Sequence, residues 1–139
     1  MPLSFSFIYL KHQVCMKVLI SEDDRSIQKT IASHLDSMGL EVIVTSDGRE
    51  ALKVLQENVP DIVITDIVMP YTSGLELIGL IKSNISRTIP IMVLSAIDEE
   101  DTVMIAFKLG ADDFITKPFE LPELTVRVNR LLQMAKAKA

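Results

Sequence analysis

Two hydrophobic patterns alternate along the chain from residue 17 onward. The first consists of short runs rich in Val and Ile, as expected for strands buried on both faces of a sheet. The second consists of segments in which apolar residues recur three and four positions apart, which predicts amphipathic helices. The runs that predict strands lie at 17–20, 41–45, 61–65, 90–94 and 113–116.

Turn and capping residues agree with this division. Asp47 and Ser73 stand where they would cap the second and third of five predicted helices. Gly39 and Gly110 follow the first and fourth helices, where a left-handed residue commonly ends a helix. Five strands that alternate with five helices predict an α/β fold, with one five-stranded parallel sheet and helices on both faces.

Polar side chains follow four of the five predicted strands. They are Glu22, Asp23 and Asp24 after the first strand, Asp66 after the third, Ser95 after the fourth and Lys117 after the fifth. Taken singly, each has a structural explanation, such as helix capping by the acidic triplet. Because ligands of open α/β sheets bind beyond the carboxyl ends of the strands, we expect these groups to converge on one site.

These residue types together indicate phosphoryl chemistry. Carboxylate oxygens are the ligands that Mg²⁺ prefers, and a divalent ion would offset the repulsion between clustered carboxylates. A carboxylate beside that ion and a lysine stays ionised and can attack phosphorus. A lysine and a hydroxyl would contact the remaining phosphoryl oxygens.

Composition narrows the class of protein. The chain has 139 residues with 48% hydrophobic and 24% charged residues, which is typical of one globular domain. Its net charge of −5 excludes non-specific electrostatic binding of nucleic acid as its main role. A single cysteine, Cys15, predicts a reducing, cytoplasmic setting. No apolar stretch is long enough to cross a membrane, so no membrane contact is expected.

The motifs resemble the receiver domain of bacterial two-component response regulators. The resemblance covers about residues 16–133, and it rests on segments that match in order and spacing: 18–24, 61–70, 90–96 and 110–119, together with Gly74. It implies the flavodoxin-like, CheY-like (βα)5 fold and a phosphorylation-operated signalling switch. It also implies that the protein is no enzyme beyond its own phosphoryl transfer and dephosphorylation.

The resemblance implies a role for each acidic residue. Asp66 would accept a phosphoryl group from a sensor histidine kinase or a phosphotransfer protein. Asp23 would bind Mg²⁺ directly, and Glu22 would act mainly through water. The backbone carbonyl of Val68 would be a further ligand, together with Asp66 itself.

The same resemblance makes Lys117 the phosphate-binding lysine, with Pro118 after a cis peptide bond. Ser95 would be the switch hydroxyl and Phe114 the aromatic switch residue, although the simpler reading of Phe114 is a core side chain. The change would reach the face built by the fourth helix, the fifth strand and the last helix. A homodimer through this face, with Asp113 and Arg127 paired across it, competes with a simple ion pair within one chain.

Three departures from the family pattern leave the catalytic groups intact. Ser21 occupies a position before the acidic pair that is usually small or apolar, Ser73 replaces an Asp that commonly precedes Gly74, and Phe114 has no hydroxyl. A metal-dependent phosphatase or phosphotransferase with an Asp nucleophile is the alternative function. The haloacid-dehalogenase-like version of that alternative lacks its general acid, because Val68 stands two residues after Asp66.

A flavin-binding module is a third alternative, which the acidic loop after the first strand disfavours because it would repel a phosphate. We expect residues 1–15 to be an extension without a part in the chemistry, and residues 134–139 to be a short tail. The 111–114 stretch, with Glu123 and Arg127, resembles receivers that precede winged-helix DNA-binding domains. The sequence thus leaves open a single-domain regulator or the receiver of a larger one, with no nucleic-acid contact from these residues.

Overall fold

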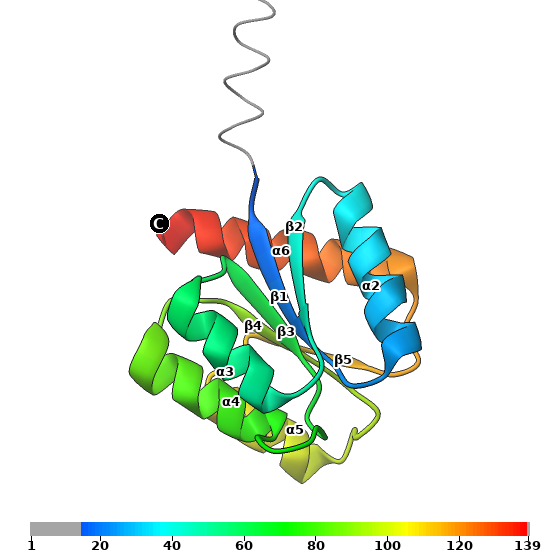
Figure 1. Ribbon diagram of the computed structural model, residues 1–139. Coiled ribbons are helices and arrows are strands. Elements are labelled where there is room, and N and C mark those ends of the chain that lie inside the picture. Colours follow the sequence, from blue (N-terminus) through cyan, green and yellow to red (C-terminus); the bar gives the residue numbers. More distant parts are fainter. Residues whose placement is uncertain (1–14, 139) are drawn as a thin grey trace, which may run out of the picture.

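The computed structural model describes residues 15–138, which form one sheet with helices on both sides (Figure 1). Its strands are β1 (Lys17–Ser21), β2 (Glu41–Thr45), β3 (Ile62–Thr65), β4 (Ile91–Ser95) and β5 (Asp113–Thr116). Its helices are α2 (Arg25–Ser37), α3 (Gly48–Glu57), α4 (Gly74–Leu80) with the π-helical turn η1 (Ile81–Ile85), α5 (Glu100–Leu109) and α6 (Leu121–Lys138). The predicted α/β fold is confirmed.

The strands are all parallel and lie in the order β2-β1-β3-β4-β5. The chain runs from β1 outward to β2 and then crosses back to β3 on the other side of β1. This reversal leaves the carboxyl ends of β1 and β3 side by side with their following helices on opposite faces. Such a switch point opens a crevice for a site.

Each face of the sheet has its own core. Helices α2 and α6 cover one face, and α3, α4 and α5 cover the other (Figure 1). Fully buried Ile31 and Leu35 anchor α2. By contrast, α5 is anchored through Ala106, while four of its apolar side chains are 37–48% exposed. These are Met104, Ile105, Phe107 and Leu109.

The predicted caps are confirmed. Asp47 and Ser73 cap α3 and α4 with their side chains, and Ser73 forms a reciprocal capping box with Glu76. Gly39 and Gly110 have positive φ angles of 85° and 122°, which glycine adopts without the steric cost that a Cβ imposes.

Two features at helix ends were not predicted. The third helix ends in the wider π-helical turn η1, and Lys82 of this turn reaches forward to donate to the carbonyls of Arg87 and Ile89. The last helix continues through Lys138, and Met134 and Ala135 pack against the core. The division of the chain at residues 15 and 133 stays a prediction, and residues 1–14 lie outside the described part. Among the described helices, none is long and apolar enough to span a bilayer.

Candidate functional site

Three carboxylates meet at the switch point between β1 and β3. Glu22 and Asp23 follow β1 and Asp66 follows β3, and each offers one oxygen within 4.8 Å of the others. Glu22 and Asp66 are 1% and 8% exposed, whereas Asp23 is exposed to solvent. Asp24, the third acid of the triplet, instead caps α2 by accepting from the amides of Ser26 and Ile27.

Lys117 links the two buried carboxylates. Its Nζ donates to Glu22 Oε1 at 2.5 Å and to Asp66 Oδ2 at 2.8 Å, although it lies 95 and 51 residues away in sequence. The cluster therefore contains three carboxylates and one ammonium, which contacts two of them. The net charge of these four side chains is negative. Because Asp23 is exposed, a small cation can reach the cluster from solvent beside it.

Burial sets the protonation of this cluster. Burial raises the pKa of the Glu22 carboxyl, and the nearby Asp66 charge raises it further, against hydrogen bonds from Lys117 and the Asp24 amide. Burial lowers the pKa of Lys117, but its hydrogen bonds to Asp66 and Glu22 outweigh that effect and raise it overall. Lys117 is thus a fixed ammonium, and an ionised Glu22 is costly until another cation arrives.

The donor set fits a hard divalent cation. All three side chains offer oxygen, and Mg²⁺ is bound through one or two carboxylates with several waters retained. The open side at Asp23 leaves room for those waters. The Val68 side chain is 63% exposed and takes no part in the cluster.

The backbone around Asp66 is held at several points. The Asp66 amide donates to the Ser21 carbonyl at 2.9 Å, and the Ile67 amide donates to Asp66 Oδ1 at 2.6 Å. The Gly74 amide donates to the Ile67 carbonyl at 2.8 Å. A Cβ at Gly74 would lie 1.9 Å from the Asp66 carbonyl oxygen, so only glycine fits where α4 begins against this loop.

A second glycine contacts the same loop from α3. A Cβ at Gly48 would lie 2.2 Å from the Thr72 carbonyl oxygen. Beside this contact, Arg49 stacks on the Tyr71 ring at 3.9 Å, and Tyr71 has a φ of 69°, which is uncommon outside glycine. Sequence reasoning missed Gly48, because a close approach between residues 24 positions apart has no local signature.

Neither Ser95 nor Phe114 contacts Asp66 among the hydrogen bonds of the described residues. Ser95 is 1% exposed, its Oγ accepts from the Ile97 amide, and its carbonyl accepts from the Lys117 amide at 2.9 Å. Phe114 is half-buried and packs against the core beneath α3, α4 and α5. The peptide bond between Lys117 and Pro118 is cis, as expected.

Asp113 and Arg127 pair within one chain. Arg127 Nη1 donates to Asp113 Oδ1 at 2.7 Å, and Glu123 accepts from the same guanidinium on its other side. Arg130 lies 3.6 Å from the second Asp113 oxygen. The structure therefore contains the simple ion pair within one chain.

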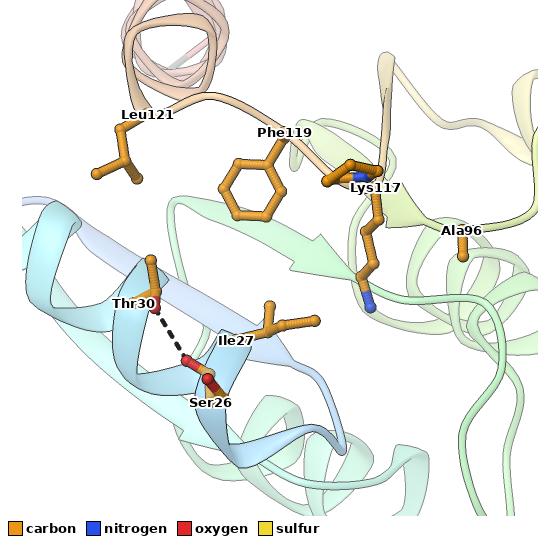
Figure 2. A pocket seen from close by; sticks show the side chains of 8 residues that line it. Ser26, Ile27, Thr30, Ala96, Lys117, Phe119 and Leu121 are labelled. Carbon is orange, nitrogen blue, oxygen red and sulfur yellow. Dashed lines mark hydrogen bonds between the residues drawn. The ribbon is translucent and has the colours of Figure 1, made fainter.

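A pocket of about 440 Å³ lies between α2 and the loop after β5 (Figure 2). Figure 2 shows Ile27 on one wall facing Phe119 on the other, with Lys117 extending from the same loop as Phe119. Most of the other lining groups are small or apolar, among them Ala96, Pro118 and Leu121. An apolar hollow thus adjoins the carboxylate cluster and shares Lys117 with it.

Comparisons with known proteins agree with this geometry. Residues 18–129 match the family described as response regulator receiver domain. The chain belongs to this family. It is a CheY-like receiver domain of a two-component response regulator, and receiver domains are in general signalling switches rather than conventional enzymes.

The receiver domain has curated relatives that are longer. It is 35% identical to the alkaline phosphatase synthesis transcriptional regulatory protein PhoP of Bacillus subtilis, over 88% of this chain and 51% of that protein. It is also 35% identical to the response regulator MprA of Mycobacterium leprae, over 87% of this chain and 53% of that protein. The chain thus spans about half the length of these relatives.

Solved structures of receiver domains superpose closely. The receiver domain of the Francisella response regulator 1452 is 37% identical, with a TM-score of 0.78 over 85% of this chain and 97% of that one. The chemotaxis response regulator CheY4 of Vibrio cholerae is 29% identical, with a TM-score of 0.81 over 86% of this chain and all of that one. Receiver domains bind Mg²⁺ at an acidic pocket and are phosphorylated by histidine kinases or phosphotransfer proteins.

Proposed function

We propose that Asp66 accepts a phosphoryl group and that this receiver domain thereby acts as a phosphorylation-operated switch. The single observation that carries the proposal is the contact of one ammonium, Lys117 Nζ, with both Asp66 and Glu22 inside a carboxylate cluster. An Asp66 oxygen forms the new bond to phosphorus, and the bond between phosphorus and the donor histidine nitrogen breaks. The histidine leaves with that electron pair.

The residues of the cluster divide the work. Asp23, Asp66 and the Val68 carbonyl would hold Mg²⁺, with Glu22 acting mainly through water. The bound ion would neutralise charge on the transferring phosphoryl group. The Asp66 side chain is held in place by the Ile67 amide and Lys117, so the attacking carboxylate is oriented before the donor arrives. Lys117 would then stay with the phosphoryl oxygens.

The test is labelling by acetyl phosphate, which supplies a phosphoryl group without a protein donor. Intact-protein mass spectrometry should find one added phosphoryl group when Mg²⁺ is present and none in EDTA. Asp66→Asn should take up no label, whereas Asp61→Asn, at the opposite end of β3, should be labelled like the wild type. Equal labelling of Asp66→Asn would refute the assignment.

The pocket between α2 and the β5–α6 loop supports a place for the protein donor. We propose that the helix bearing the phosphohistidine docks there, because the pocket is apolar and opens beside Lys117. Ile27→Glu should then slow transfer from the cognate donor and leave labelling by acetyl phosphate unchanged. A variant that loses both reactions would instead point to damage at the acceptor site.

We further propose that the signal leaves through the face formed by α5, β5 and α6. A phosphoryl group on Asp66 offers new acceptor oxygens, and the Ser95 hydroxyl would move inward to donate to one of them. Phe114 is half-buried, so it would bury more of its ring by following that movement. The exposed apolar side chains of α5 give a partner or a second copy of the chain a surface to read.

Beryllofluoride, which mimics an aspartyl phosphate, tests this route. Amide NMR shifts on its addition should extend to 95–107 and 114–119. Ser95→Ala should shrink the second set while Mg²⁺ binding persists. Shifts confined to the surroundings of Asp66 would mean that phosphate is taken up but not transmitted.

A further inference from the structure

The hydroxyl of Ser21 lies at the end of β1 and contacts the loop that follows Asp66. Ser21 is fully buried, and its Oγ lies 3.0 Å from the sulfur of Met69 and 3.4 Å from the Asp47 carbonyl oxygen. Hydroxyl donors normally lie 2.5–3.0 Å from an oxygen acceptor, so the Asp47 contact is long. The single proton of this hydroxyl is therefore assigned to the Met69 thioether.

The sulfur of Met69 has no better donor nearby among the described residues. The Thr65 hydroxyl lies 4.0 Å from it and instead donates to the Asp66 carbonyl at 2.8 Å. Met69 is 9% exposed and belongs to the core beneath α3 and α4. The Ser21 contact thus fixes where the thioether lies within that core.

Ser21 consequently holds the loop at both of its ends. Its carbonyl accepts from the Asp66 amide at 2.9 Å, and its hydroxyl donates to Met69. The two residues between these points are Ile67, whose carbonyl accepts from Gly74, and Val68. Within residues 15–138, no hydrogen bond of Val68 is found, and its side chain is 63% exposed.

We infer that Ser21 and Met69 are positioning residues for the Val68 carbonyl. The Val68 carbonyl and the Met69 amide belong to one planar peptide unit, so holding Met69 restricts the direction of that carbonyl. This inference rests on the proposed function, because it takes the Val68 carbonyl as a Mg²⁺ ligand. It adds that a serine at this unusual place sets metal affinity through a hydroxyl–thioether hydrogen bond.

The test measures the Mg²⁺ dissociation constant by calorimetric titration of the metal alone. Ser21→Ala and Met69→Leu should each weaken Mg²⁺ binding about tenfold. This factor is the lower end of the range of losses seen when a residue that supports a metal ligand is replaced. The double variant should be no weaker than either single one, since both remove the same contact. Thr45→Val is the matched control, because Thr45 pairs with Ser21 across β1 and β2 and its hydroxyl donates to the Ile20 carbonyl rather than to the loop after Asp66.

A kinetic measurement separates positioning from general damage. The Mg²⁺ concentration for half-maximal labelling by acetyl phosphate should rise in Ser21→Ala, while the rate at saturating Mg²⁺ stays that of the wild type. The rate is kept because the Ser21 backbone, Ile67 and Lys117 still hold Asp66. An unchanged dissociation constant in both single variants would overturn the inference alone. A wild type that binds no Mg²⁺ would overturn the proposed function first.

Discussion

Replacing Gly74 by alanine should damage both the fold and the acceptor site. The added Cβ would lie 1.9 Å from the Asp66 carbonyl oxygen and 2.8 Å from the Ile67 Cα. Real Cβ contacts stay above 3.0 Å, so the loop or the start of α4 must shift by about 1.1 Å. Both neighbours are backbone atoms, and no side-chain rotation relieves the clash.

The magnitudes follow from that shift. Overpacking of this kind costs roughly 1–3 kcal/mol of unfolding free energy. For a domain of this length, that lowers the melting temperature by about 4–12 °C. A misplacement of about 1 Å can also slow a reaction roughly 100-fold, so labelling of Asp66 by acetyl phosphate should fall by about that factor.

Gly79→Ala is the matched control in the same helix. A Cβ there meets nothing closer than the Leu109 Cδ2 at 3.9 Å, so the substitution should stabilise the helix by roughly 0.5–1 kcal/mol. Urea unfolding followed by circular dichroism gives both free energies. If Gly74→Ala matched the wild type in stability and labelling, the close-approach argument would be refuted. Equal losses of stability and labelling in both variants would instead indicate that alanine disturbs α4 itself.

The carboxylate cluster and its surroundings give three further predictions. Mg²⁺ at 100 times its dissociation constant should stabilise the fold by about 2.7 kcal/mol, and Asp23→Ala should lose most of that gain. A melting temperature that does not change in millimolar Mg²⁺ would contradict the proposed metal site. In EDTA at pH 7, Glu22→Gln should be more stable than the wild type, because burial raises the pKa of Glu22 and makes its ionised form costly in the fold. That advantage should vanish as the pH falls below 4.5, the ordinary pKa of a glutamate carboxyl, because Glu22 is then protonated in both the folded and the unfolded chain. An advantage that grows on acidification would refute this prediction. Finally, Val68→Asn should shorten the half-life of the phosphorylated form. By resemblance to the family, Val68 and Ile97 flank the water that attacks the phosphoryl group, and neither apolar side chain can orient that water. An unchanged half-life, measured by mass spectrometry, would contradict this prediction.

The sequence was sufficient for the fold because its signals are local. Val- and Ile-rich runs and helical spacing are read within ten residues, and the cap at Ser73 follows from its place before a helix. The convergence of Glu22, Asp66 and Lys117 was also predictable, although they are far apart in the chain. Parallel topology brings every strand's carboxyl end to one edge, so the order of elements alone brings them together.

What escaped prediction depends on approaches between distant segments. The contact of Gly48 with Thr72 and the bond from Ser21 to Met69 join residues that share no periodicity. The hydrogen bonds from Lys82 of η1 to two carbonyls likewise have no signature in the sequence pattern. Side-chain pairing is equally non-local, and so the ion pair between Asp113 and Arg127 within the chain is known only from the structure.

The shallow anchoring of α5 has a consequence for local unfolding. This helix is docked through the small side chain of Ala106, whereas α2 buries Ile31 and Leu35 completely. The free energy needed to open a segment scales with the apolar surface that it must expose, so α5 opens at a fraction of the cost of global unfolding. We therefore expect the amide hydrogens of α5 to exchange with solvent before those of α2. A movement of α5 would disturb only the edge of the core that contains Ala106, and the core beneath α2 and α6 would stay intact.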